Sequence, residues 1–69
     1  MHINRLSFLR IADAIVDDEQ WYSVIVSGPV AAWLREQDKT LVSEVVGITL
    51  ATTFDVHETI YSTLVLKWT

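Results

Sequence analysis

Cysteine is absent from this 69-residue sequence, and proline and glycine are nearly so, with one and two copies. Without cysteine the chain can form no disulfide, no thiolate zinc site and no thiolate nucleophile. Disulfides belong to oxidising compartments, so their absence fits a cytoplasmic protein, and that is the location we expect. The few strong turn signals come from Gly28, Pro29 and Gly47.

A surplus of basic residues and a long apolar segment are also missing. Nine acidic residues outnumber five basic ones, giving a net charge of −4. This disfavours direct binding to DNA or RNA, which usually requires a basic surface. The longest segments without a charge, residues 20–34 and 45–54, are shorter than the roughly 18 apolar residues that a membrane span needs. We expect no membrane association, and the polar residues after Met1 indicate a whole gene product without a secretory signal.

The length allows one hydrophobic core, so we predict a single domain over residues 1–69. Apolar residues make up 51% of the chain, slightly above the usual range of about 45 to 50%. A body this small has too much surface for its volume to bury all of them. Small natural domains without disulfides often oligomerise, so we expect a homo-oligomer or an interface with a partner.

The clearest predicted element is a short helix over residues 29–37. Pro29 suits its first turn, where the backbone N–H groups have no partner within the helix. Val30, Trp33 and Leu34 then recur at the spacing of one helical stripe. A helix this short is marginal alone, so it must dock on a core, with Trp33 as the expected anchor.

Three segments have the β-branched and aromatic composition of strands: residues 21–26, 42–54 and 59–68. Gly47 is expected to mark a bulge or bend, because a straight strand over the second segment would span roughly 40 Å. In the third segment apolar and polar residues alternate, as in a half-exposed strand. With residues 55–58 as a polar connection, the last two segments predict a C-terminal hairpin.

Residues 5–16 are compatible with a helix or a strand. A helix would gather a broad apolar arc, and Ala12 and Ala14 favour it. A strand would place alternate apolar residues on one face and make residues 17–20 a hairpin turn, and an acidic run is unfavourable at a helix C-terminus. We therefore predict an α+β fold in the order ββαββ, a four-stranded antiparallel sheet with one packed helix. The alternative, with an N-terminal helix in place of the first strand, is αβαββ.

No residue pattern indicates a catalytic, cofactor or metal site. His2 and His57 are the only histidines, and they lack the spacing of a zinc-binding pair. We expect His57 to lie with Asp55 and Glu58 in a solvated turn. The acidic run lacks the glycine and the alternating ligands of a calcium loop, and no serine has the flanking glycines of a nucleophile elbow.

Two groups of side chains are candidates for binding a partner. The acidic group can meet a basic surface, and the aromatic group offers the large rings that dominate binding energy at interfaces. Adjacent strand residues point to opposite faces, so one of Trp21 and Tyr22 is expected to leave the core. The acidic candidates are Asp13, Asp17, Asp18 and Glu19, and the aromatic candidates are Trp21, Tyr22, Tyr61 and Trp68.

These features favour a non-enzymatic interaction module that binds and modulates another macromolecule, with inhibition as the favoured mode. Small acidic proteins of this kind are common among phage and mobile-element products that act against host defences. The expected partner is another protein, with a nucleic-acid-binding enzyme as one candidate, because acidic side chains can occupy a groove meant for nucleic acid. The alternative is a structural component that self-associates through its sheet edges, which pair readily unless they are blocked.

Overall fold

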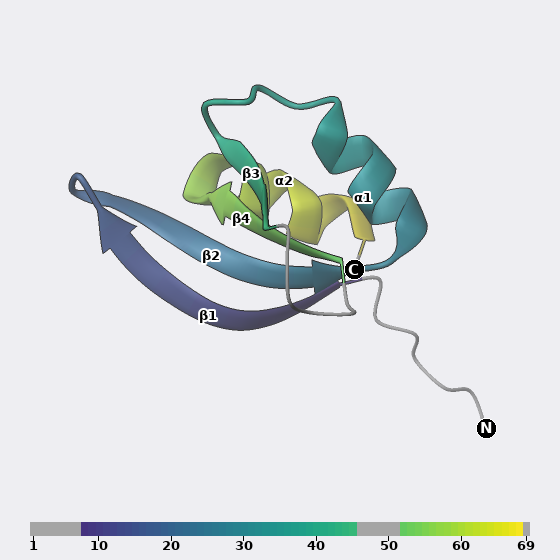
Figure 1. The fold of residues 1–69 in the computed structure, drawn as a ribbon, viewed down its shortest axis with the longest axis horizontal. Coiled ribbons are helices and arrows are strands. Elements are labelled where there is room, and N and C mark those ends of the chain that lie inside the picture. Colours follow the sequence, from purple (N-terminus) through teal and green to yellow (C-terminus); the bar gives the residue numbers. More distant parts are fainter. Residues whose placement is uncertain (1–7, 46–51, 69) are drawn as a thin grey trace.

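Two helices accompany four strands in the computed structural model, which describes residues 8–45 and 52–68 (Figure 1). The chain runs through β1 (Phe8–Val16), β2 (Glu19–Val26), α1 (Gly28–Arg35), β3 (Val42–Val45), β4 (Thr53–His57) and α2 (Glu58–Trp68). The order is therefore ββαββα. Neither of these described helices has the length and apolar content needed to cross a membrane.

The four strands form one antiparallel sheet in the order β1-β2-β4-β3. β2 and β4 lie at its centre, and β1 and β3 form its edges. This confirms the predicted α+β class and the four-stranded antiparallel sheet. It also confirms a strand, and not the alternative helix, over the described part of the first predicted element. Residues 5–7 of that element lie outside the described residues.

The register gives the sheet two chemically different faces. In the central strands Val24 lies opposite Phe54, and Tyr22 lies opposite Val56. Directly opposed residues share a face, so these side chains point to the same side, where both helices contribute to the core. The intervening residues of each strand point to the other side of the sheet, which we name the open face.

The core lies between the sheet and the helices. From α1 it receives Val30, Ala31 and Leu34, and from α2 it receives Ile60 and Leu64. The strands contribute Val24, Val26, Val42, Phe54 and Val56. The core is therefore one-sided, because all of its strand residues come from the face toward the helices.

The predicted helix anchor, Trp33, lies at the margin of this core. Its ring is partly buried and meets the Trp68 ring edge to face, with 5.3 Å between the ring centres. Leu34, the next residue, is fully buried. The predicted apolar stripe is confirmed, but the large ring bridges the two helices and the smaller leucine fills the centre.

The prediction of a final strand over residues 59–68 is wrong, because this segment belongs to helix α2. Its apolar residues fit both periods, since Ile60, Leu64 and Trp68 are four residues apart and would also share one strand face. The β-branched composition favours a strand locally. Packing of Ile60 and Leu64 against the apolar face of the sheet overrides that preference.

The prediction of one long strand over residues 42–54 is also wrong. The described part is divided between β3, which ends at Val45, and β4, which begins at Thr53 and continues to His57. Most of the predicted polar connection therefore lies within β4, and Glu58 is the first residue of α2. Gly47, the predicted bulge, lies outside the described residues.

Asp17 and Asp18 form a two-residue turn between β1 and β2. Both have positive φ angles, 52° and 65°, and Val16 pairs with Glu19 across the turn. Two central residues with positive φ are characteristic of a type I′ turn, whose twist matches that of the flanking strands. The predicted hairpin turn is confirmed, but it is shorter than residues 17–20 because β2 already begins at Glu19.

Arg35 at the end of α1 connects this helix to the edge strand β3. Its guanidinium donates hydrogen bonds of 3.1 and 2.9 Å to the two carboxylate oxygens of Glu44, and it lies 5.7 Å from the centre of the Phe54 ring. These hydrogen bonds lower the pKa of the Glu44 carboxyl and raise the pKa of Arg35. Both side chains are exposed, so the pair positions α1 more than it stabilises the fold.

Phe54→Ala should remove most of the stability of the protein. The Phe54 ring is 1% exposed at the centre of the core, and truncation of a buried phenylalanine costs about 3 to 5 kcal/mol. Urea unfolding followed by circular dichroism measures the loss. Leu66→Ala is the control, because Leu66 is 83% exposed on α2 and should change stability by less than about 0.5 kcal/mol. Equal losses in the two variants would contradict the core described above.

Asp18→Gly should stabilise the protein by about 0.5 to 1 kcal/mol, because a residue with a Cβ is strained at positive φ and glycine is not. Thermal and urea unfolding measure the difference. Asp18→Asn is the control, since it removes the same charge but keeps the Cβ. A gain from Asn as large as that from Gly would assign the effect to charge and not to the backbone conformation.

Candidate interaction surface

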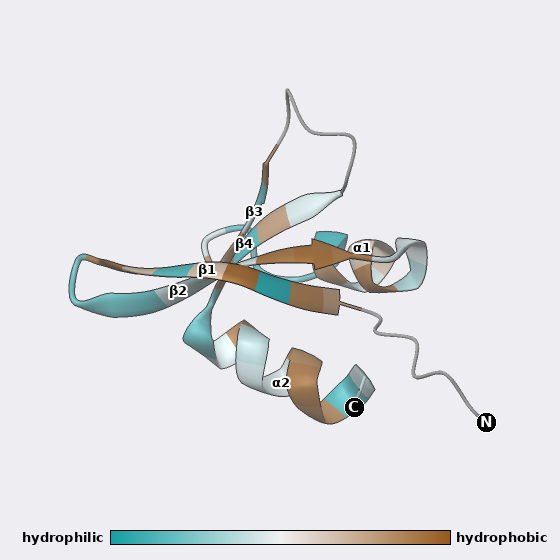
Figure 2. Ribbon diagram, turned by 90° about the horizontal axis from the view of Figure 1, so that it is seen from below, coloured by the Kyte–Doolittle hydropathy of each residue, from teal (hydrophilic) through white to brown (hydrophobic). Residues whose placement is uncertain are grey.

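The open face carries no helix in the part of the chain that the structure describes. α2 lies against the opposite side of the sheet, and α1 lies beside its end (Figure 2). At the centre of the open face, Trp21 and Ser23 of β2 lie opposite His57 and Asp55 of β4. These four residues place one large ring, one imidazole, one hydroxyl and one carboxylate within a small area.

An open hollow of about 250 Å³ lies on this face. Its lining consists of Ala14, Val16, Trp21, Ser23, Ser43 and Asp55. The edge strand β1 supplies an apolar wall and the edge strand β3 supplies a hydroxyl on the other side. Sites for small molecules usually measure about 300 to 1,000 Å³. The hollow is smaller than that, and its size suits one or two side chains of a protein partner.

Ser23 and Asp55 are joined to each other on the floor of the hollow. The Ser23 hydroxyl donates a hydrogen bond of 2.6 Å to Asp55 Oδ1, and both residues are partly buried. A hydroxyl bonded to a carboxylate makes a short, strong hydrogen bond. The Ser23 hydroxyl therefore pairs with a carboxylate and not with an imidazole, which a serine nucleophile would require as its base.

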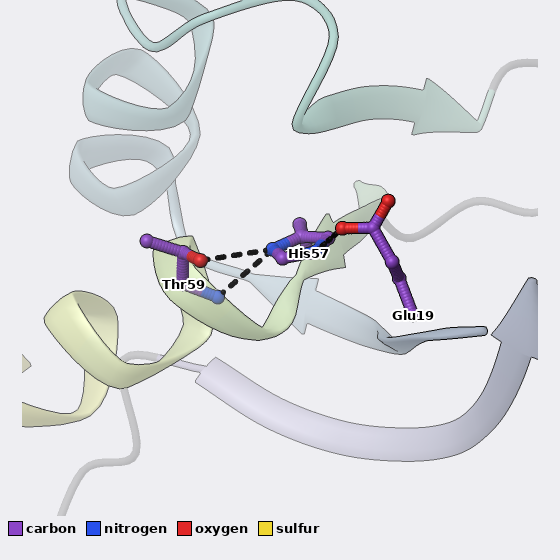
Figure 3. A network of polar contacts seen from close by, with 3 residues as sticks. All are labelled: Glu19, His57 and Thr59. Atoms are coloured by element: carbon purple, nitrogen blue, oxygen red, sulfur yellow. Dashed lines mark hydrogen bonds and ion pairs between the residues drawn. The ribbon is translucent and has the colours of Figure 1, made fainter. Parts of the chain in front are cut away.

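The imidazole of His57 connects β4, β2 and α2 (Figure 3). The backbone N–H of Thr59 donates to Nδ1 at 3.1 Å, so Nδ1 carries no proton, and the Thr59 hydroxyl lies 3.0 Å from the same atom. Nε2 therefore holds the ring proton and donates it to Glu19 Oε1 at 2.5 Å. Because His57 directly precedes α2 and accepts from the second helical N–H, it is the N-cap of that helix.

The expectation that His57 lies in a solvated turn is wrong. Its side chain is 11% exposed, and the Trp21 ring packs against it edge to face with 5.4 Å between the ring centres. Glu19, at the other end of the hydrogen bond, is exposed. The histidine thus supports the end of the hairpin on which the acidic residues lie.

Negative charge is concentrated on the β1–β2 hairpin. Residues 8–26 contain four acidic residues and one basic residue, so they account for −3 of the net charge of −4. The tip of the hairpin extends beyond the end of β4 (Figure 1). Asp17, Asp18 and Glu19 are all exposed there, and we name them the acidic tip. The tip adjoins the hollow, because Val16 and Trp21 flank the turn and also line that hollow.

Half of the predicted binding residues are therefore brought together by the structure. Asp17, Asp18 and Glu19 form the acidic tip, and Trp21 lies at the adjoining edge of the open face. The expectation that Trp21 and its neighbour Tyr22 point to opposite sides agrees with the register, because only Tyr22 lies opposite a core residue.

The other four predicted residues lie on the helix side of the sheet. Tyr22 and Tyr61 stack on each other with 4.2 Å between ring centres, and Trp68 meets Trp33. Asp13 is exposed on β1 opposite Tyr22. The three rings are partly buried against the core, so packing accounts for them and they do not join the open face.

Sequence reasoning missed Ser23, Asp55 and Ser43 as parts of this surface. Ser23 and Asp55 are 32 residues apart in the chain, and only the pairing of β2 with β4 brings them together. No local pattern indicates that pairing. The sequence did contain one relevant signal. Trp21, Ser23 and Ile25 alternate with the core residues of β2, which places Ser23 on the same face as Trp21.

Over residues 8–45 and 52–68, no three side chains of the types that ligate metals converge. No protein-family model matches the chain, and comparisons with curated proteins and with solved structures return no similar protein.

His57→Ala should destabilise the protein by about 1 kcal/mol more than His57→Asn, because asparagine keeps a side-chain acceptor for the Thr59 N–H and alanine does not. Both variants lose the contact with Trp21 and the hydrogen bond to Glu19, so their difference isolates the helix cap. Urea unfolding of the two variants measures it. Equal stability of the two would show that the cap contributes nothing.

Proposed function

We propose that this protein is a non-enzymatic interaction module that binds and inhibits another protein through its open face and acidic tip. The observation that carries the proposal is the position of a partly apolar hollow directly beside three consecutive exposed acidic residues on a protruding hairpin. An apolar centre with a charged rim is the usual anatomy of a protein interface.

The complementary surface of the partner has an apolar side chain that enters the hollow and basic residues that face the acidic tip. Apolar contacts at a desolvated centre provide affinity, and charges at the rim provide selectivity and fast association. Nucleic-acid-binding enzymes carry basic surfaces of this kind, so a groove of such an enzyme is the partner class that we favour. When the protein fills that groove, the enzyme cannot bind nucleic acid and is inhibited. An anti-defence protein of a phage or mobile element would act in this way.

The polar groups of the open face support binding over catalysis. Ser23 and Asp55 are hydrogen-bonded to each other, and both ring nitrogens of His57 already have partners. Each group is therefore held in one position by the fold. Because the net charge is only −4, we expect shape and apolar contact to contribute more than electrostatic mimicry of nucleic acid.

Ser43→Arg should weaken binding of the authentic partner, because it places a long charged side chain in the hollow from the exposed strand β3. The tagged protein is used to capture partners, and each captured protein is then tested as a purified component by calorimetry. Ser62→Arg is the matched control, since it makes the same change at an exposed position of α2, on the other side of the sheet. The partner should bind wild type and Ser62→Arg with equal affinity and Ser43→Arg at least tenfold more weakly.

The double variant Asp17→Asn with Asp18→Gly tests the acidic tip separately, because Asn-Gly keeps the type I′ turn while removing both charges. It should weaken binding and reduce its dependence on salt. If every stoichiometric partner binds Ser43→Arg as well as wild type, the open face is not the binding surface. If only the double variant has no effect, the acidic tip is removed from the proposal.

A second role, self-assembly through a sheet edge, is favoured by a separate observation on β1. This strand exposes apolar side chains along an outer edge to which no described strand is paired.

A further inference from the structure

The outer edge of β1 presents a long strand for pairing. β1 has nine residues, whereas the other edge strand, β3, has four. No described strand pairs with this outer edge, and Leu9, Ile11, Ile15 and Val16 are 50–72% exposed. Natural proteins usually block such an edge with proline, with lysine or other charges, with a bulge or with a covering element. Of these, β1 has one bulge and the two charges Arg10 and Asp13. β1 contains neither proline nor lysine.

A bulge in β1 decides which side each of its residues faces. The register with β2 shifts after Arg10, which leaves Ile11 as the extra residue. Before the bulge the even-numbered residues face the helix side, because Arg10 lies opposite Val24. After the bulge the odd-numbered residues do so, because Asp13 lies opposite Tyr22. Arg10 and Asp13, the only charged residues of β1, therefore point to the same side of the sheet.

A second copy of β1 can pair antiparallel with this edge only in a register that matches these faces. Directly opposed residues share a face, so an even-numbered residue before the bulge must meet an odd-numbered residue after it. The register whose two-fold axis lies at the bulge, between Ile11 and Ala12, opposes Arg10 with Asp13 of the second copy, and by symmetry Asp13 with Arg10. The remaining opposed pairs in this register are apolar: Phe8 with Ile15, Leu9 with Ala14, and Ile11 with Ala12.

We propose that the protein forms a two-fold symmetric dimer in which β1 pairs with β1 of a second copy in this register. The strand that pairs with this edge is β1 of a second copy and not a strand of another protein. The reason is that two-fold symmetry brings Arg10 of each copy opposite Asp13 of the other, and β1 has no other charges. The pairing closes on itself, as most homodimer interfaces do. It joins the two sheets into one of eight strands, with both open faces on one side and only the short β3 strands left at the edges.

This dimer uses the edge of the sheet and does not depend on the interaction proposed for the open face. Both copies present their hollow on the same side of the joined sheet, and the antiparallel pairing places the two acidic tips at opposite ends of the β1 pair. A dimer of this kind therefore binds two copies of a partner, or two sites on one partner, which raises the apparent affinity without a new contact. The interface is one strand wide, and small interfaces are usually transient. The dimer fraction should consequently rise with protein concentration.

Sedimentation equilibrium and light scattering on the full chain test the proposal, and a dimer doubles the mass from 7.9 kDa. Positions 10 and 13 of opposite copies face each other twice in the dimer. In Arg10→Asp two aspartates therefore meet at each of these places, and in Asp13→Arg two arginines do. Each variant alone should raise the dissociation constant of the dimer at least tenfold. An equimolar mixture of the two should restore the dimer as a heterodimer, because every Asp then meets an Arg. Glu36→Arg, at an exposed position after α1, changes the charge as Asp13→Arg does and should leave the dimer intact.

Circular dichroism and urea unfolding of the single variants verify that loss of the dimer is not loss of the fold. Wild-type protein that stays at 7.9 kDa up to its solubility limit would overturn the proposal. A dimer that persists in both single variants would place the interface elsewhere, and variants that fail to recover on mixing would exclude this register. Ser43→Arg should keep the dimer while losing the partner, so failure of one proposal is separable from failure of the other.

Discussion

The antiparallel pairing of β2 with β4 is the constraint on which both faces of the molecule depend. It places Val24 opposite Phe54 on one side and Ser23 opposite Asp55 on the other. The first pair lies in the core that both helices cover, and the second forms the floor of the hollow. A shift of β4 by one residue would exchange its two faces, exposing Phe54 and turning Asp55 toward the helices, and a shift of β2 would expose Val24 in the same way. The same register therefore specifies the core and the candidate interaction surface, and neither can change without the other.

The small size of the chain explains why the described helices cover only one face of the sheet. A sheet needs a second layer to bury an apolar face, and two short helices of eight and eleven residues supply one such layer here. Among the described residues, most of the exposed large apolar side chains lie on β1: Leu9, Ile11, Ile15 and Val16. Composition predicted an excess of apolar surface, but it could not locate that excess, because location depends on which strand ends up at the edge of the sheet.

The parts of the structure that depend on local chemistry were predictable from the sequence, and the parts that depend on distant pairing were not. The hairpin of β1 and β2 follows from alternating residues around two aspartates that tolerate positive φ. Residues 59–68 satisfy the strand and the helix period equally, so only their packing on the sheet decides for α2. In the same way the acidic tip is visible in the sequence, whereas the contact of Ser23 with Asp55 requires the fold.

The conformation of the acidic tip bears on the binding role proposed for it. Asp17 and Asp18 both adopt positive φ, which Asn-Gly would adopt with less strain, and with Glu19 they form a run of three consecutive exposed acidic residues. Backbone strain and like-charge repulsion both disfavour this choice. The Glu19 carboxylate accepts a hydrogen bond from His57, but Asp17 and Asp18 are exposed and are not packed against the core. Residues that are locally unfavourable and structurally unnecessary are typical of functional sites. A basic partner relieves the repulsion on binding, so the local cost in folding is itself a reason for the tip to favour such a partner.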